Sequence, residues 1–242
     1  MQSIDQHYMI DIPLLVRITS IADLHKNDLV LEIGPGTGYL TRYLQKIAKK
    51  VFVIEKDPKL LKELKEKFNN NKNITYIGGD ATKLDFPNFT KCVSNLPYTI
   101  CEPLMWRFIR EKFEMLVFVV PLSFAEILTG KTPSRLKLLS DAFYEVEITQ
   151  KIGPESFYPK PKTESALIKI TPKEGNFFLR EFFIQYDKKT KNALREILMK
   201  SGMTKSESQE YITLRLKPSI QDKNIVNLSL EEIKEIVKLF TQ

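Results

Sequence analysis

Cysteine and histidine are scarce in this chain, which has two of each among its 242 residues. Cys92 and Cys101 lie nine positions apart, and His7 and His25 lie well before both of them. This arrangement matches neither the ligand spacing of a zinc site nor a disulfide framework. We therefore expect no bound metal, and a reducing, cytoplasmic setting for the protein.

Long apolar runs are missing as well. No stretch approaches the roughly 20 apolar residues that a membrane-spanning helix needs. The first ten residues also lack the positively charged and apolar regions of a secretory signal. Because the hydrophobic fraction is an ordinary 43%, the chain can still bury a sizeable core. We expect a folded protein with no membrane association.

Negative charge is in the minority. The chain has 30 Asp and Glu against 37 Lys and Arg, which gives a formal net charge of +7 and a pI near 9.2. A basic balance of this size favours a polyanionic partner such as a nucleic acid, although many proteins without such a partner are mildly basic.

Glycine is concentrated at one turn early in the chain. Residues 28–33 form a short apolar run that ends at Gly34, Gly36 and Gly38, and residues 39–48 follow with helical spacing. A strand, a glycine turn and a helix are typical of the opening of a doubly wound α/β sheet. The Gly-x-Gly-x-Gly spacing differs from the Gly-x-Gly-x-x-Gly of dinucleotide enzymes, so a pyrophosphate cradle is not the preferred interpretation.

Acidic residues follow the next two predicted strands. Residues 51–54 end at Glu55, where a carboxylate is well placed to bind ribose hydroxyls. Residues 74–77 are followed by Asp80, which can accept a hydrogen bond from an adenine amino group. The alternatives are a solvated surface glutamate and an aspartate that caps a turn.

The tetrapeptide Asn95-Leu96-Pro97-Tyr98 follows another predicted strand at residues 91–94. Pro97 fixes its own φ and keeps Leu96 out of the helical region, so the segment is extended and turned. The Asn95 amide oxygen and the Leu96 carbonyl beside the Tyr98 ring would suit an exocyclic amine on a flat heterocycle. The alternative is an Asx-type turn with a packed tyrosine.

Together these segments resemble the ribosomal RNA adenine N6-dimethyltransferase family, whose members use S-adenosylmethionine. Two further segments agree: one resembles the N-terminal element that covers the cofactor, and one resembles the late Phe-x-Pro-x-Pro-Lys-Val-Asp-Ser-Ala element. The segments, in the family's order, are residues 5–9, 31–38, 55, 79–81, 95–98 and 157–166. The match spans about residues 5–172, and the ordered combination is far more specific than any one motif.

The resemblance implies a fold, a reaction and a set of site residues. It implies an α/β, Rossmann-like S-adenosyl-L-methionine-dependent methyltransferase domain at residues 1–172 and a small helical RNA-binding domain at residues 173–242. The substrate would be adjacent adenines in a hairpin loop of small-subunit ribosomal RNA, on a precursor of the small subunit, and the enzyme would act as a monomer in ribosome biogenesis. The expected cofactor-binding residues are Gln6, His7, Met9, Gly34, Gly36, Glu55, Lys56, Asp80, Ala81 and Asn95; the catalytic residues are Asn95, Leu96, Pro97 and Tyr98; the base-stacking residues are Tyr98 and Phe157.

The chain departs from the family pattern at two places. Relatives usually carry Gln-Lys-Glu before an Ala-Glu pair, which residues 121–126 lack, and an Arg-Arg-Lys cluster where residues 186–189 stand. Two alternatives therefore stay open. One is the macrolide-resistance branch, which methylates large-subunit RNA and usually has Ile in place of Leu96. The other is a ribosome-assembly or nucleic-acid-packaging factor that kept the fold but lost turnover.

Overall fold

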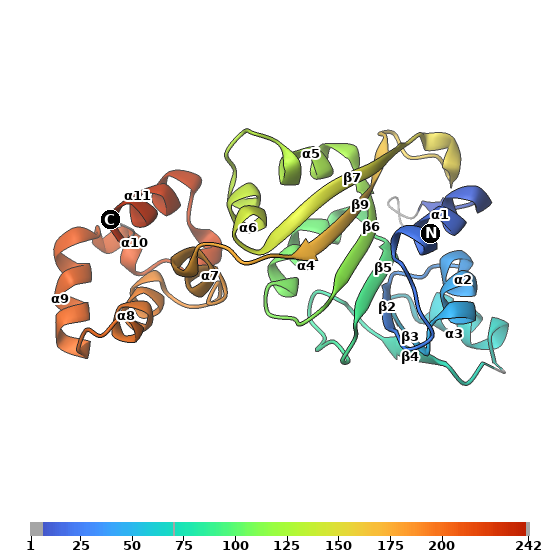
Figure 1. Cartoon of the computed structure of the whole chain (residues 1–242), viewed down its shortest axis with the longest axis horizontal. Coiled ribbons are helices and arrows are strands. Elements are labelled where there is room, and N and C mark those ends of the chain that lie inside the picture. Colours follow the sequence, from blue (N-terminus) through green and yellow to red (C-terminus); the bar gives the residue numbers. More distant parts are fainter. Residues whose placement is uncertain (1–6, 70, 241–242) are drawn as a thin grey trace. The chain divides into compact units, whose positions relative to one another are not determined.

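The computed structural model describes residues 7–69 and 71–240 (Figure 1). The chain forms two compact units. The first runs to Thr129 and resumes at Glu145–Pro172, and the second comprises Gly130–Tyr144 and the chain from Lys173 onward. In the described part of the chain, no helix is long and apolar enough to cross a membrane.

A mixed sheet dominates the first unit. Among the described residues its strand order is β4-β3-β2-β5-β6-β9-β7. The strands are β2 (Leu29–Ile33), β3 (Lys50–Glu55), β4 (Ile74–Gly78), β5 (Lys91–Asn95), β6 (Met115–Pro121), β7 (Tyr144–Ile152) and β9 (Ser165–Pro172). The pairs β2–β3, β3–β4, β2–β5 and β5–β6 are parallel, and β9 is antiparallel to β6.

The strand order reverses between β2 and β5. From β2 the chain adds β3 and β4 on one side, and it then crosses to add β5 and β6 on the other. In such doubly wound sheets, ligands bind at the carboxyl ends of the strands beside this reversal. The expected Rossmann-like α/β fold is therefore confirmed, and the reversal marks the edge where a site should lie.

Helices cover both faces of this sheet (Figure 1). On one face lie α1 (Ile12–Ile21), α2 (Tyr39–Ile47) and α3 (Pro58–Lys67), and on the other lie α4 (Cys101–Phe108) and α5 (Leu122–Thr129). The starts of α1 and α3 are set locally: the Asp11 carboxylate accepts the Leu14 N–H, the Asp57 carboxylate accepts the Lys59 N–H, and a proline stands in each first turn. Such caps satisfy N–H groups that have no partner inside the helix.

The central strands are buried because both faces are covered. Val30, Val51, Val93 and Val117 have no exposed surface, one in each of β2, β3, β5 and β6. Near-continuous apolar strands of this kind are typical of parallel sheets packed between helices. The result is a rigid frame that fixes where each strand ends.

A short antiparallel ribbon joins the N-terminal arm to a late segment of the chain. It pairs β1 (Tyr8–Met9) with β8 (Phe157–Tyr158), with Tyr8 opposite Tyr158 and Met9 opposite Phe157. Directly opposed residues place their side chains on the same face. Met9 and Phe157 accordingly share the buried face and are 4% and 1% exposed.

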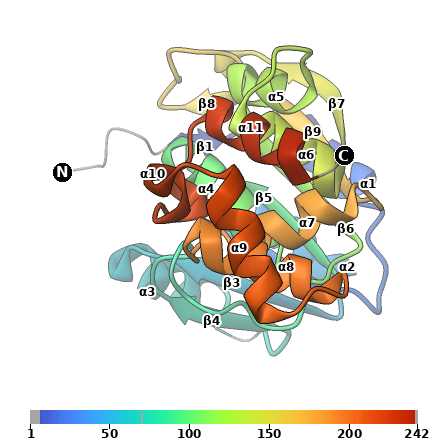
Figure 2. The same cartoon turned by 90° about the vertical axis from the view of Figure 1, so that its left-hand side faces the viewer.

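The second unit is helical among the residues described. Its helices are α6 (Arg135–Phe143), α7 (Phe177–Phe183), α8 (Thr190–Lys200), α9 (Lys205–Arg215), α10 (Pro218–Gln221) and α11 (Leu230–Phe240). Helices α8 and α9 pack against each other and lie side by side in both views (Figure 1, Figure 2).

The boundary that we expected between residues 172 and 173 coincides with a boundary between the two units, but one earlier segment also belongs to the helical unit. Residues 130–144 belong with the C-terminal helices rather than with the sheet. The Arg180 guanidinium explains this grouping, because it donates to the Ala142 carbonyl at 3.2 Å and lies 4.6 Å from the centre of the Phe143 ring. The chain therefore enters the helical unit twice.

Candidate active site

The glycine turn after β2 forms the floor of the candidate site. Gly34 and Gly36 have φ values of 66° and 55°, which residues with a Cβ adopt only at a cost. A Cβ on Gly34 would lie 3.1 Å from Cδ of Pro97, and one on Gly36 would lie 2.8 Å from the ring of Tyr8. The turn is thus closely approached by the tetrapeptide on one side and by the N-terminal arm on the other.

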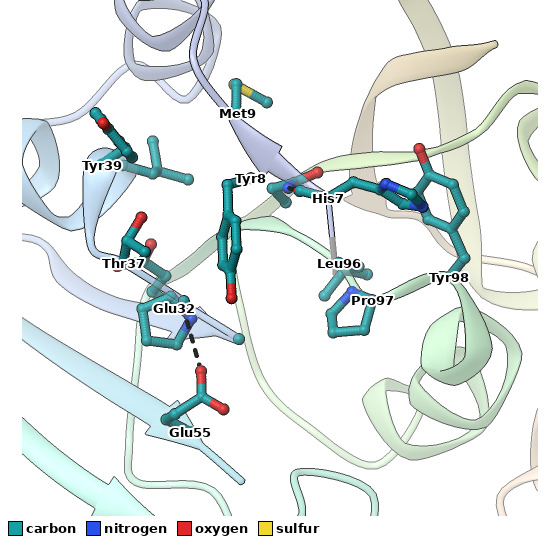
Figure 3. A pocket seen from close by; sticks show the side chains of 15 residues that line it. His7, Tyr8, Met9, Glu32, Thr37, Tyr39, Glu55, Leu96, Pro97 and Tyr98 are labelled. Carbon is teal, nitrogen blue, oxygen red and sulfur yellow. Dashed lines mark hydrogen bonds between the residues drawn. The ribbon is translucent and has the colours of Figure 1, made fainter. Parts of the chain in front are cut away.

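Two cavities open at this edge and share Gly34, Glu55 and Pro97. The larger has a volume of about 470 Å³ and is also lined by Lys56, Asp80 and Ala81. The smaller, about 80 Å³, is lined by residues that include His7, Tyr8, Met9, Glu32, Gly36, Asn95, Leu96 and Tyr98 (Figure 3). Only the larger cavity falls within the range of about 300–1,000 Å³ that is usual for small-molecule sites.

Glu55 stands where the two cavities meet. Its carboxylate accepts one hydrogen bond from the Gly36 N–H at 3.2 Å (Figure 3) and another from the Asp57 N–H at 2.9 Å. The residue is 6% exposed, so it is not the solvated surface glutamate that we considered as an alternative. The two backbone donors fix the carboxylate at the tip of β3 and leave further lone pairs for a ligand.

Asp80 lies on the far rim of the larger cavity. One of its oxygens accepts from the Thr82 hydroxyl at 2.7 Å and from the Thr82 N–H at 2.9 Å, and the other accepts from the Lys56 ammonium at 3.0 Å. The Thr82 contacts and the Lys56 contact hold the pKa of Asp80 well below its usual value. Asp80 therefore does stabilise a turn, as the alternative predicts, and it also faces the cavity as a charged acceptor.

Asn95 lies at the end of β5, and only the nitrogen of its side-chain amide is hydrogen-bonded to the described residues. Its Nδ2 donates to the His7 carbonyl at 2.9 Å, which orients the amide. Its Oδ1 is buried and has no hydrogen-bond partner among the described residues. A buried acceptor without a partner costs free energy unless a ligand or water completes it. Since Asn95 lines the smaller cavity, its open oxygen can serve a bound donor there.

Tyr98 is held from two sides. Its hydroxyl is 2.6 Å from the Ser165 hydroxyl, and its ring centre lies 5.7 Å from that of His7, with the planes tilted by 39° (Figure 3). Nδ1 of His7 is in turn 2.8 Å from the Pro159 carbonyl. Burial raises the pKa of the Tyr98 hydroxyl, so it remains a neutral hydroxyl. The tetrapeptide is thereby joined to the N-terminal arm and to β9.

Glu32 and Tyr8 are two of the residues that line the smaller cavity but were not among the predicted site residues. Glu32 is 2% exposed, and its carboxylate accepts from the Thr41 hydroxyl at 2.6 Å. Burial raises the pKa of Glu32 to about 8, although the hydrogen bond from Thr41 acts in the opposite direction. The available signal was an acidic residue inside an apolar strand, two residues before Gly34 of the glycine turn.

Tyr8 projects from β1 into the smaller cavity, and its hydroxyl is directed toward Glu55 (Figure 3). Burial and the nearby Glu55 charge raise the pKa of this hydroxyl. Because the ring packs on Gly36, any larger residue in the turn would displace it. The N-terminal arm therefore contributes a wall of the site.

One predicted site residue is not where we expected it. Phe157 was to stack on the substrate base, but its ring is 1% exposed and belongs to the hydrophobic core, on the buried face of the ribbon that it shares with Met9. The prediction for Phe157 is therefore wrong in this structure. Gln6, which we expected at the cofactor, lies outside the described residues.

Comparison with known proteins identifies the family. The model of the ribosomal RNA adenine dimethylase family matches residues 2–242. The chain belongs to this family. Its curated relatives include the "probable ribosomal RNA small subunit methyltransferase A" of Pyrococcus abyssi, which is 38% identical over 96% of this chain and 89% of the relative. The protein of the same name from Methanosarcina mazei is 35% identical over 97% and 91% of the two chains.

Solved structures agree with this assignment. A dimethyladenosine transferase from Plasmodium falciparum matches with a TM-score of 0.68 and 27% identity, covering 97% of this chain and 98% of that one. The 23S rRNA methyltransferase ErmE matches with a TM-score of 0.65, but at 22% identity over 97% and 100% of the two chains it supports the fold alone. The family resemblance predicted from the sequence is confirmed.

The family uses S-adenosylmethionine, and the residues present fit this cofactor. The larger cavity has room for a nucleoside, with the Glu55 and Asp80 carboxylates available to hydroxyl and amino donors. The smaller cavity adjoins it through Gly34 and holds the open acceptor of Asn95. The acceptor groups and the cavity volume thus agree with a nucleoside in one cavity and the reacting groups in the other.

Proposed function

We propose that this protein transfers methyl groups from S-adenosylmethionine to N6 of two adjacent adenines in a hairpin loop of small-subunit ribosomal RNA. The observation that carries the site assignment is that Asn95, whose buried Oδ1 has no hydrogen-bond partner among the described residues, lines a cavity that Tyr98 also lines. An adenine amino group supplies the missing donor, and the tyrosine ring offers a stacking surface for the base. Family membership over residues 2–242 supports the reaction and the cofactor.

The cofactor would lie across the two cavities. Glu55 would bind the ribose hydroxyls, and Asp80, Lys56 and Ala81 would surround the adenine, with Gly34 and Gly36 below. When bound, the cofactor supplies a methyl group on a sulfonium, which is already activated toward an amine. The contribution of the protein is therefore mainly to orient the amine and to exclude water.

The tetrapeptide would position the acceptor. The Asn95 amide oxygen and the Leu96 carbonyl would accept the two amine hydrogens, which frees the nitrogen lone pair from the ring and aims it at the methyl group. Pro97 packs against Gly34 and keeps the segment close to the cofactor turn. Tyr98 would stack on an adenine that has left its own stack, a step that costs a few kcal/mol and costs least in a loop.

The partner would be the small-subunit ribosomal RNA within a precursor of the small subunit, bound by a monomer in the cytoplasm. The helical second unit would hold the RNA through lysine and arginine contacts to phosphates. The names of the curated relatives favour small-subunit RNA over the large-subunit substrate of the macrolide-resistance branch, and they favour an enzyme over a packaging factor.

The test is transfer of labelled methyl groups to isolated small ribosomal subunits, with large subunits assayed in parallel. We expect modification of small subunits alone and loss of the N6 amine signal at adjacent adenines. In the variant Asn95→Ala, single-turnover rate should fall about a hundredfold or more, equivalent to about 2.7 kcal/mol, while RNA affinity changes far less.

Asn73 offers a matched control. Its Nδ2 also donates to a backbone carbonyl, that of Gln45 at 2.9 Å, and its Oδ1 is also buried without a partner among the described residues, but it lines neither cavity. Asn73→Ala should lower the melting temperature without slowing transfer. An Asn95→Ala protein that methylates at the wild-type rate would contradict the proposed mechanism.

A further inference from the structure

Ser165 contacts the candidate site without lining either cavity. It is the first residue of β9, lies opposite Pro121 of β6 and has no exposed surface. Its hydroxyl lies 2.6 Å from that of Tyr98, across 67 positions of sequence. A hydrogen bond of this length between two hydroxyls, one of them fully buried, is well ordered.

The position of Ser165 is itself fixed by the sheet. The pairing of β9 with β6 runs from Pro121 opposite Ser165 to Leu116 opposite Ile170, and the Leu122 N–H donates to the Glu164 carbonyl at 2.9 Å just beyond it. Residues buried in a packed sheet transmit their position rigidly. Ser165 therefore offers Tyr98 an anchor point that does not move with the loop after β5.

The ring of Tyr98 is restrained at both ends. The loop fixes its Cα, Ser165 fixes its hydroxyl, and the His7 ring limits its rotation from one side at 5.7 Å. A stacking surface that is already oriented before the base arrives avoids an entropy cost on binding. This bond also explains the use of tyrosine rather than phenylalanine here, since a phenyl ring has no group to anchor.

We propose that Ser165 is a positioning residue for methyl transfer: it holds the plane of the Tyr98 ring at the angle that the extruded adenine requires. The proposal rests on the proposed function and deepens it, because Ser165 acts on the substrate only through Tyr98. Loss of the bond leaves the stacking face in place but lets it tilt. The rate of transfer should then fall more than the affinity for cofactor.

A double-mutant cycle tests this coupling. Ser165→Ala and Tyr98→Phe each remove the same hydrogen bond from opposite ends, so we expect each to slow single-turnover methylation of small subunits about three- to tenfold. The double variant should be no slower than the slower single variant, since the bond can be lost only once. Cofactor affinity, measured by calorimetry, should remain within about twofold of the wild type in all three proteins.

Thr149→Val is the matched control for stability. The Thr149 hydroxyl donates to the Leu167 carbonyl at 3.0 Å, two residues along β9 from Ser165, whereas the Tyr98 hydroxyl bonds to Ser165. This variant should lower the melting temperature comparably and leave the rate unchanged. If Ser165→Ala does not fold, the comparison of Tyr98→Phe with wild type still decides: a wild-type rate in Tyr98→Phe overturns the proposal.

The possible failures can be told apart. The role of Ser165 would be overturned if the rate losses of the two single variants multiplied in the double variant, or if Thr149→Val slowed methylation as much as Ser165→Ala. Neither outcome would affect the proposed function, because the wild-type enzyme would still be active. A wild-type protein that transfers no methyl to small subunits would overturn both.

Discussion

Two backbone N–H groups, those of Gly36 and Asp57, hold the Glu55 carboxylate at the tip of β3. A carboxylate that accepts two backbone N–H bonds is held in one orientation. It also places an acceptor at the point where the glycine turn and β3 approach each other. The side chain is thus prepared for a hydroxyl-bearing ligand before one arrives.

Replacing Glu55 by alanine should therefore weaken cofactor binding. The loss of a charge-assisted hydrogen bond amounts to roughly 1.5–3 kcal/mol, or about 10- to 150-fold in Kd. Isothermal calorimetry with S-adenosylmethionine measures this directly. Glu66→Ala is the control, because Glu66 is 68% exposed and makes only a surface ion pair with Lys62. Unchanged affinity in Glu55→Ala would remove this residue from the site.

Glu32 makes the stability of the folded protein depend on pH. Its pKa is about 8 in the folded protein against 4.5 for an ordinary glutamate, so between these values the folded state holds a proton that the unfolded state has released. Stability from this residue is therefore full below about pH 4.5 and declines as the pH rises toward 8. The decline approaches about 1.4 kcal/mol per pH unit for one proton.

Glu32→Gln should flatten this decline, because an amide cannot ionise but can still accept from the Thr41 hydroxyl. The measurement is the free energy of unfolding in urea at pH 5.5, 7 and 8.5, compared between the variant and the wild type. Thr41→Val should do the reverse and extend the decline to higher pH, since it removes a hydrogen bond that lowers the pKa of Glu32. Parallel curves for wild type and Glu32→Gln would contradict the assignment.

Strand β5 leads into the tetrapeptide of the candidate site at one end and is anchored at the other by a buried ion pair. The Lys91 ammonium is 3.1 Å from the Asp28 carboxylate and also donates to the Asp23 carbonyl, and Lys91 is 5% exposed. The Thr90 hydroxyl adds a bond to Asp28 at 3.1 Å. These contacts tie β5 to the start of β2 and so fix how far Asn95 extends at the opposite edge.

Removing one member of this pair should destabilise the fold strongly. Lys91→Met leaves the Asp28 charge buried without its partner, which costs about 3–5 kcal/mol, whereas Lys91→Met combined with Asp28→Asn should recover much of this loss. Urea unfolding of the three proteins measures the difference. If Lys91→Met alone were as stable as Lys91→Met combined with Asp28→Asn, the ion pair would contribute nothing beyond packing.

The sequence predicted the strands and helices whose patterns lie within a few neighbouring residues. The strand before Gly34 and the helix after it were predictable because their apolar periods are read within a few residues. The same holds for the strands that end at Glu55 and Asn95. Since parallel strands share one carboxyl edge, the meeting of these ends in a single site also followed from the pattern.

What the sequence did not predict depends on contacts between distant segments. The pairing of Met9 with Phe157 buries the phenylalanine that we expected at the substrate, and a shift of one residue along a strand exchanges its faces. The same limit applies to the Tyr98–Ser165 bond and to the packing of Arg180 on Phe143. None of these partners is marked by a local pattern.

Over the whole molecule, the net charge of +7 is the property most relevant to an RNA partner. In the helical unit many lysines are already paired with acids, such as Lys188 with Glu196 and Lys200 with Glu181. A groove of α8 and α9 is lined by two cations, Arg195 and Lys205, and by one acid, Glu210. We expect this groove to contribute phosphate contacts.

Affinity for RNA should fall steeply with salt, because each phosphate contact releases counterions and contributes about 0.7–0.9 to the slope of log K against log salt. The double variant Arg195→Gln, Lys205→Gln should reduce that slope by about 1–2 while cofactor affinity stays unchanged.

Substitution is preferable to deletion after residue 172, because a truncated chain would leave α6 without the Arg180 contacts that hold it. Lys62→Gln, a change on α3 at a side chain that is 79% exposed, is the control. Binding that is independent of salt, or an equal change of slope in the control, would show that the helical unit does not hold RNA through these charges.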